Sequence, residues 1–206
     1  MISFLKFLRF LGPLMLFFAT FVILPPLAMQ AFTSHVEIIF LSIFISCLVY
    51  GILIELTLRR KRFTYTPRDG FLITSFGWFF VSILASLPFL FSGMSYADSI
   101  FEAVSGLTTT GSTTISNLSE LSESLLIYRQ LLQWAGGVGL IIVVLAIIPA
   151  ASGGIKVLQA ETSGFAENSF SPRLRKTARS LLRFYLGITL LCAISYWLAG
   201  MTYFEA

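Results

Sequence analysis

The chain has 206 residues, of which 56% are hydrophobic and only 12% are charged, and its mean hydropathy is +0.87. Soluble domains carry about 25% charged residues, so this composition excludes an ordinary globular enzyme and indicates an integral membrane protein. The formal net charge of +4 gives no reason to expect nucleic acid as a partner. Membrane lipid is the expected surrounding.

Cysteine and histidine usage gives no sign of a metal centre or a disulfide. Cys47 and Cys192 both fall inside apolar runs, where a cysteine behaves as a small buried hydrophobic residue. His35 is the only histidine, so a zinc site lacks the ligands that it would need. We therefore expect both cysteines to be buried and no cofactor to be bound.

The first apolar run extends from Phe10 to Phe32 without a charge and follows Lys6 and Arg9. A basic start before an apolar stretch is also typical of a signal peptide, but this run is too long and lacks a clear small-residue cleavage site. The pattern predicts an uncleaved membrane anchor. Pro25 and Pro26, near its far end, are expected to kink or end the helix.

A second span is predicted from Val36 to Leu58, with Glu37 and Glu55 close to its ends. Acidic groups at those depths reach the interface, so a snorkelling or polar-network role is favoured over an ion site. Four consecutive cations follow at 59–62. They could form a nucleic-acid patch or an anionic-lipid site, but a signal for membrane topology is the favoured interpretation.

Three further spans are predicted: Gly70–Phe91, Leu125–Pro149 and Phe184–Met201. The polar segment between the last two has the composition of a cytoplasmic loop. Within Leu125–Pro149, a patch of small residues at 135–139 lets another helix approach closely. This patch supports an alternative function, a non-conducting membrane scaffold or assembly subunit.

The segment Ser99–Thr114 lies between the third and fourth spans and is too short and too polar to cross a bilayer, which takes about 20 apolar residues. Ser99 and Glu102 fit a capping box, and Asp98 adds negative charge at the helix start. The prediction is a helix from Ile100 to about Leu107, with Asp98 and Glu102 as capping residues. The alternative role for these two acids is a cation-attracting vestibule.

Basic residues that flank spans are held on the cytoplasmic side. If there are five spans and the Ser99–Thr114 segment dips in and out, the cations of the N-terminus, of 59–62 and of 156–183 all lie on one side. Arg129 is the exception, just inside a span. The charge bias therefore predicts a cytoplasmic N-terminus and a re-entrant segment that enters from outside.

The end of this segment, Thr109–Ser112, carries the oxygen atoms that a dehydrated potassium ion requires. Backbone carbonyls in an extended loop replace the water of the ion, and glycine permits the backbone angles that turn neighbouring carbonyls toward one axis. The filter candidates are Thr109, Thr110, Gly111 and Ser112. A segment rich in serine, threonine and glycine is also typical of an ordinary surface turn. The position of this segment between two predicted spans is what favours a filter.

Three stretches resemble a known family: FEAVSGLTTTGST (Phe101–Thr113), PRDGFLITSFGW (Pro67–Trp78) and QWAGGVGLIIVVLAIIP (Gln133–Pro149). They are similar to the first membrane-pore-membrane repeat of the Trk/Ktr superfamily of potassium uptake proteins, TrkH type. The residues Ala160–Glu161 and Ser171–Arg173 also match the approach to that family's second repeat.

The resemblance implies a potassium pathway in which Thr110 and Gly111 contact the ion, flanked by Thr109 and Ser112. It also implies four such repeats around one pore, a homodimer, a cytoplasmic nucleotide-binding regulatory subunit of TrkA type, and a place in the bacterial cytoplasmic (inner) membrane. Only one filter loop is present in these residues, so we expect the chain to correspond to the N-terminal part of such a protein.

The resulting prediction is an all-α polytopic membrane protein with five transmembrane helices, one re-entrant pore helix and an extended filter loop. Its function would be potassium translocation, with potassium as substrate; an intramembrane enzyme is not expected, because no general-base pair can be assembled. The predicted parts are an N-terminal helix pair (1–66), a membrane-pore-membrane repeat (67–150, re-entrant loop 96–114), a cytoplasmic loop (151–176) and the first helix of an incomplete second repeat (177–206).

Overall fold

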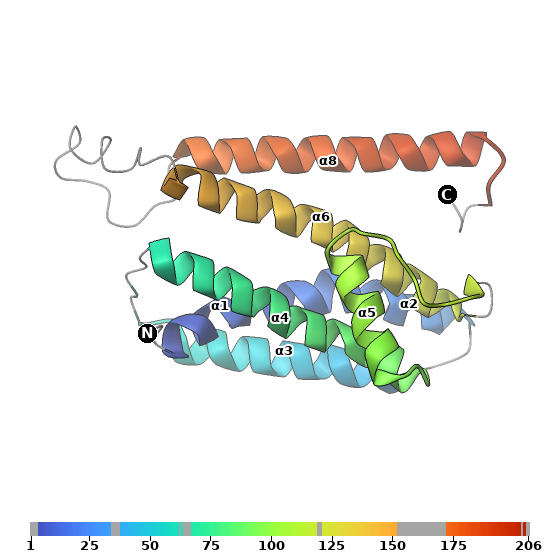
Figure 1. The fold of residues 1–206 in the computed structure, drawn as a ribbon, viewed down its shortest axis with the longest axis horizontal. Helices are drawn as coiled ribbons and strands as arrows, with labels where there is room; N and C mark the ends of the chain where they lie inside the picture. Colours follow the sequence, from blue (N-terminus) through green and yellow to red (C-terminus); the bar gives the residue numbers. More distant parts are fainter. Residues whose placement is uncertain are drawn as a thin grey trace. The chain divides into compact units, whose positions relative to one another are not determined.

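The computed structural model divides the chain into two compact units, 1–137 and 138–206. All regular secondary structure in the described residues is helical (Figure 1). Side chains are described for most of these residues, but not for 31–33, 67–68, 140–151, 172–175 and 178. The structure describes residues 4–33, 38–61, 63, 67–118, 121–151, 172–202 and 204.

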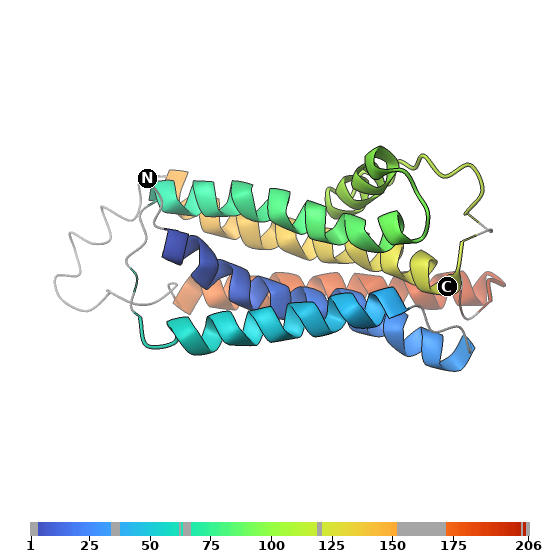
Figure 2. The ribbon, with the colours of Figure 1, turned by 90° about the horizontal axis from the view of Figure 1, so that it is seen from below.

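The first unit is built mainly from long helices, with the shorter helix α5 between α4 and α6. The chain from α1 to α2 runs alongside α3, and α5 lies against α4 (Figures 1 and 2). The elements are α1 (Phe4–Phe17), the π-helical turn η1 (Phe18–Ile23), α2 (Leu24–Thr33), α3 (Ile38–Leu58), α4 (Pro67–Phe91), α5 (Tyr96–Leu107) and α6 (Glu123–Ala151), whose residues beyond Gly137 belong to the second unit.

Among the described residues, four helical stretches are long and apolar enough to cross a membrane. They agree with the first, second, third and fifth predicted spans, and the fourth predicted span coincides with α6. The helix that carries the first apolar run begins before it, at Phe4, and includes Lys6 and Arg9. The four stretches are Phe4–Gln30, Ile38–Leu58, Asp69–Phe91 and Arg179–Leu198.

Pro25 and Pro26 do not end the first helix; a π-helical turn, η1, precedes them. Proline has no N–H to donate and its ring crowds the carbonyl one turn earlier. The chain responds by widening the turn, and the backbone N–H of Leu24 donates to the carbonyl of Ala19, five residues back. The helix then continues as α2. The disturbance predicted at the two prolines therefore takes the form of a local change from α-helix to π-helix.

Tyr128 of α6 holds the core of the first unit together. Its ring is fully buried and lies 5.5 Å from the ring of Phe40 in α3 and 5.4 Å from that of Phe89 in α4. Its hydroxyl donates a 2.8 Å hydrogen bond to the carbonyl of Ala85, three residues before Pro88, in the turn that this proline disturbs. Because a buried hydroxyl needs a partner, one side chain fixes α6 to two other helices.

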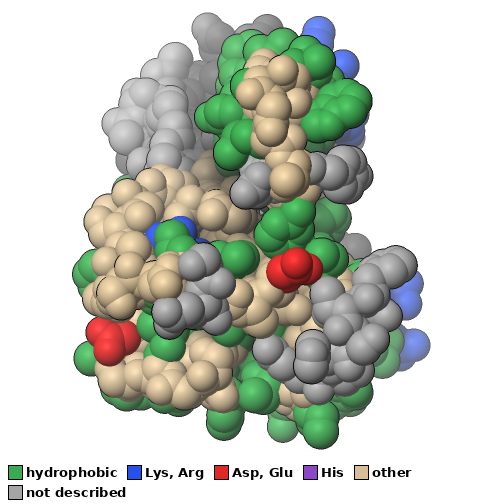
Figure 3. Space-filling model, turned by 90° about the vertical axis from the view of Figure 1, so that its right-hand side faces the viewer, with side chains coloured by type: hydrophobic (Ala, Val, Ile, Leu, Met, Phe, Trp, Pro, Cys, Tyr) green, Lys and Arg blue, Asp and Glu red, His purple; other side chains and the backbone are tan. Residues whose placement is uncertain are grey.

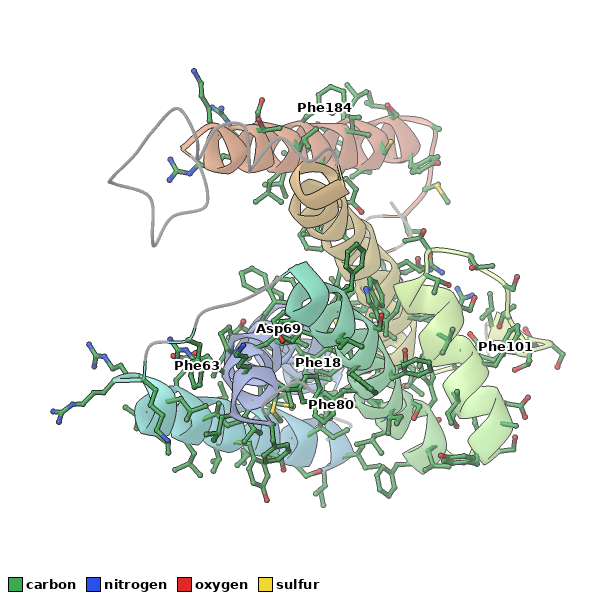
Figure 4. The ribbon with its side chains drawn as sticks, turned by 60° about the vertical axis from the view of Figure 1, so that its left-hand side comes forward. Phe18, Phe63, Asp69, Phe80, Phe101 and Phe184 are labelled. Carbon is green, nitrogen blue, oxygen red and sulfur yellow. The ribbon has the colours of Figure 1, made fainter. Side chains whose placement is uncertain are left out.

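Two ion pairs tie α1 to its neighbours at the end of the unit where the chain begins. Lys6 Nζ lies 2.8 Å from Asp69 Oδ2 at the start of α4, and Arg9 Nη1 lies 2.6 Å from Glu55 Oε2 near the end of α3. Figure 4 shows Asp69 beside α1. The predicted polar-network role of Glu55 is therefore confirmed, whereas Glu37 and His35 lie outside the described residues.

In the second unit, α8 (Pro172–Leu198) is the long helix, and its apolar stretch Arg179–Leu198 has no buried residue. Figure 4 shows Phe184 projecting from it. The prediction that Cys192 is buried is wrong, since the side chain is exposed like its neighbours, whereas Cys47 in α3 is fully buried as predicted. The predicted loop from 151 to 176 lies largely outside the described residues.

One residue of the predicted small-residue patch at 135–139, Gly136, packs against another helix of the first unit. A Cβ placed on Gly136 would lie 2.2 Å from the carbonyl oxygen of Leu107, at the end of α5. A Cβ on Gly106 would lie 3.0 Å from the Cβ of Leu132. The backbones of α5 and α6 therefore touch, and glycine at 136 is what permits the contact.

We expect Gly136→Ala to lower the melting temperature of the detergent-solubilised protein, because overpacking costs about 1–3 kcal/mol. Gly70→Ala is the matched control: Gly70 is also helical, in α4, but a Cβ there meets nothing within 4 Å. The control should melt at the wild-type temperature or slightly above, since alanine favours a helix over glycine. Equal melting of both variants would show that α5 and α6 do not touch at Gly136.

Candidate functional site

Helix α5 begins one turn earlier than predicted, at Tyr96. Ser95 is the N-cap, and its Oγ accepts a 3.1 Å hydrogen bond from the backbone N–H of Asp98 while donating to Asp98 Oδ2 at 2.6 Å. The predicted capping box of Ser99 and Glu102 is wrong, because both residues lie within the helix rather than at its start, and both side chains are fully buried. A second serine with an acid three residues later was present in the sequence and marks the true start.

The C-terminal end of α5 closes in a Schellman motif. The N–H of Thr110 donates to the carbonyl of Ser105 at 3.0 Å, and the N–H of Thr109 donates to that of Gly106 at 2.9 Å. Thr109 takes the left-handed position, with φ of 58°, where glycine is usual and a β-branched residue is strained. Two of the last carbonyls of the helix are thereby satisfied within the chain.

After this turn the chain runs back along α5 as an extended loop. Ser105 Oγ donates a 2.6 Å hydrogen bond to the carbonyl of Ser112. One turn earlier in α5, Glu102 Oε1 accepts from Thr113 Oγ1 at 2.6 Å and from the N–H of Thr114 at 2.7 Å. The loop is thus attached to α5 at two levels and is not an unsupported surface turn.

A buried ion pair between α5 and α6 supports the loop. Glu102 is fully buried and Arg129 of α6 is 6% exposed, and Arg129 Nε lies 3.0 Å from Glu102 Oε2. Arg129 Nη2 also donates to the carbonyl of Gly111 at 3.2 Å. Neither predicted role of Glu102, helix cap or vestibule acid, is correct. The sequence signal for the pair was Arg129, the one cation that the predicted topology places away from the cytoplasmic side.

The structure brings the four filter candidates together on the outer surface of this loop. Thr109, Thr110, Gly111 and Ser112 are all exposed, and Gly111 has φ of 75°, in the left-handed region that favours glycine. Their assignment as ion ligands stays a prediction. Figure 3 shows the end of the molecule that carries the loop: polar side chains and backbone cover much of it, and the described acidic side chains are scattered.

The carbonyl oxygens of the loop are not equivalent. Those of Gly111 and Ser112 accept hydrogen bonds from Arg129 and Ser105. Within the described residues, no hydrogen bond engages the carbonyls of Thr109 and Thr110. The hydroxyl of Thr108 donates its proton to the carbonyl of Val104. In the 2.8 Å contact between the hydroxyls of Thr108 and Thr110, Thr110 is therefore the donor. The lone pairs of the Thr110 hydroxyl oxygen are not used in that contact.

Comparison with known proteins decides the family. The sequence pattern of the TrkH family, described as cation transport protein, matches residues 35–205. The chain belongs to the TrkH family. Like other TrkH proteins it is a membrane protein, as its apolar helices indicate.

Curated TrkH relatives cover almost the whole chain. The Trk system potassium uptake protein TrkH of Vibrio parahaemolyticus is 37% identical over 209 residues, which is 99% of this chain and 43% of the relative. Its namesake in Escherichia coli is 36% identical over 96% of this chain and 42% of the relative. The Escherichia coli potassium uptake protein TrkG is 33% identical over 89% of this chain and 39% of the relative.

A solved structure agrees with the fold. The crystal structure of the potassium transporter TrkH from Vibrio parahaemolyticus matches with a TM-score of 0.79 at 36% identity, over 98% of this chain and 41% of that one. This TrkH chain therefore spans about two fifths of the length of the relatives that it matches.

The buried pair makes a specific prediction for Glu102→Gln. The amide keeps an oxygen for Thr113 and Thr114 but leaves Arg129 buried without a counter-charge, which costs about 3–5 kcal/mol. We expect a lower melting temperature and faster hydrogen exchange at the N–H of Thr114. Adding Arg129→Gln should recover part of the loss, so the double variant is more stable than the sum of the single changes predicts; strict additivity would show that the two side chains do not interact.

Proposed function

We propose that the loop Thr109–Ser112 forms one wall of a potassium pathway. The observation that carries this proposal is a set of exposed oxygens, the carbonyls of Thr109 and Thr110 with the hydroxyl of Thr110, on a loop anchored by a buried ion pair. A dehydrated potassium ion requires oxygens at fixed positions to replace its water. Arg129 serves this function indirectly, because it donates a hydrogen bond to the carbonyl of Gly111 and thereby holds the loop in place.

The hydrogen bonding of the loop carbonyls refines the predicted ligand set. In the proposed pathway, Thr109 and Thr110 supply the oxygens nearest to the ion, while Gly111 supplies the backbone angle that the turn requires. Gly111 and Ser112 remain part of the filter as residues that shape it. One loop offers only a few oxygens, so further loops of the same kind must surround the ion for complete coordination.

We place α5 as a re-entrant pore helix. Its 12 residues span about 18 Å at 1.5 Å per residue, which is too short for a hydrocarbon core of about 30 Å. A chain that enters the bilayer as α5 must leave it as non-helical backbone, and such backbone is tolerated only against protein or water. The hydrogen bonds from the loop to Glu102 and Ser105 provide the protein support.

The wider assignment follows from this placement and from the family. The proposed arrangement has five spans, a cytoplasmic N-terminus, and a repeat of two spans and a pore loop over residues 67–150, in the bacterial inner membrane. The names of the relatives describe potassium uptake systems. A homodimer and a cytoplasmic nucleotide-binding subunit of TrkA type complete the proposal. In the competing hypothesis, a non-conducting scaffold or assembly subunit, the patch at 135–139 would dock another helix; Gly136 of this patch already packs against α5.

Replacement of Gly111 tests the proposed filter. In the native full-length protein, Gly111→Ala puts a side chain at φ of 75°, which strains the turn and shifts the oxygens of Thr109 and Thr110. We expect the preference for potassium over sodium to fall severalfold, measured as competing rubidium and sodium uptake in cells that lack their own potassium transporters.

Gly93→Ala is the matched control for backbone strain. Gly93 also has a positive φ, of 98°, and a Cβ there would meet nothing within 4 Å, but it lies in the turn between α4 and α5. This variant should lose stability without losing ion preference. An unchanged preference in Gly111→Ala, with the protein present in the membrane at normal levels, would overturn the filter assignment.

A further inference from the structure

The basic segment at the end of α3 takes no part in the described ion pairs or in the proposed ion pathway. Five cationic side chains are described at the end of the first unit where the chain begins. Two of them, Lys6 and Arg9, sit on α1, and three directly follow α3: Arg59, Arg60 and Lys61.

The two groups differ in their partners. Lys6 is paired with Asp69 at 2.8 Å and Arg9 with Glu55 at 2.6 Å, so both cations are neutralised inside the protein. These two acids are also the only ones described at this end of the unit. Every described acid that could have balanced the cations after α3 is therefore already engaged.

Arg59, Arg60 and Lys61 are exposed, and no ion pair to them occurs among the described residues. The N–H of Lys61 donates to the carbonyl of Leu58 at 3.0 Å, which fixes the turn that carries the three side chains. Figure 4 shows nitrogen-tipped side chains leaving this end of α3 and pointing away from the other helices. The charge of the three residues faces outward.

An exposed apolar stripe leads along α3 to these cations. Val49, Leu53 and Leu56 are 48%, 52% and 64% exposed, and their spacing of four and three residues puts them on one helix face. The helix ends at Leu58, and the turn that carries Arg59, Arg60 and Lys61 follows directly after this stripe. A ligand that uses both features must have an apolar part and an anionic end at the membrane surface.

We propose that this surface is a binding site for an anionic phospholipid. The phosphate of the headgroup interacts with Arg59, Arg60 and Lys61, and an acyl chain lies along Val49, Leu53 and Leu56. Arginine is well suited to phosphate because its guanidinium donates two parallel hydrogen bonds. A nucleic acid or a free anion would make no use of the apolar stripe, so the phospholipid is the ligand that the surface fits.

The test uses the purified full-length protein in detergent, titrated with phosphatidylglycerol or with phosphatidylcholine of the same acyl chains. Native mass spectrometry measures the lipid-bound fraction. We expect the wild type to prefer phosphatidylglycerol, and the variant Arg59→Gln/Arg60→Gln/Lys61→Gln to lose that preference by about fivefold per cation removed, with a smaller difference at high salt.

Two further variants keep the result interpretable. Lys6→Gln/Asp69→Asn removes a cation at the same end together with its partner and should keep the wild-type preference. Arg59→Lys/Arg60→Lys retains the charge and should keep most of it, which separates lipid binding from misfolding. Equal loss in the triple variant and in Lys6→Gln/Asp69→Asn would overturn the proposal, as would no loss in the triple variant. Competition by millimolar inorganic phosphate as effective as that of the lipid would also overturn it, since the site would then hold a free anion.

Discussion

The arrangement of the loop depends on one interaction, the contact between the buried carboxylate of Glu102 and the guanidinium of Arg129. Burying a charged group costs desolvation free energy, and only good geometry and full hydrogen bonding offset that cost. Here both conditions hold: the carboxylate also receives Thr113 and the N–H of Thr114, and the guanidinium also reaches the carbonyl of Gly111. Two consecutive helices and the loop between them are thereby joined at one point. An exposed polar loop gains a fixed shape because its supports are buried.

Close packing of α5 on α6 makes this joint possible. The backbone of α6 at Gly136 meets the last carbonyl of α5, and four residues earlier Leu132 meets Gly106. Tyr128, one further turn back, fixes the same helix to α3 and α4. Since α6 is held on one side by the core and on the other by α5, Arg129 lies between two fixed contacts. Rigid neighbours leave the long arginine side chain little freedom to take another partner.

Much of the fold could be predicted from the sequence, because apolar runs, basic flanks and a short polar interruption are local signals. The long helices and the position of the Thr109–Ser112 loop were identified in this way. The start of α5 was not, since Ser95 and Ser99 are both acceptable caps and only tertiary burial of Ser99 decides between them. The partnership of Glu102 and Arg129 was also missed: 27 residues separate them, and no periodicity connects a helix to the span that follows a loop. Exposure of Cys192 likewise depends on neighbours that a pattern does not reveal.

The π-helical turn in the first membrane segment has a consequence for how that segment is interpreted. A normal α-helix advances about 100° per residue, and a widened turn that places one more residue before the same hydrogen bond rotates everything after it by about that amount. The faces that Leu11 and Met15 define before Phe18 therefore do not continue in register beyond Ile23. A single helical wheel drawn over the whole segment would therefore place the residues of its second half on the wrong face. Gln30, which is buried, is one of the residues whose position such a wheel would misassign.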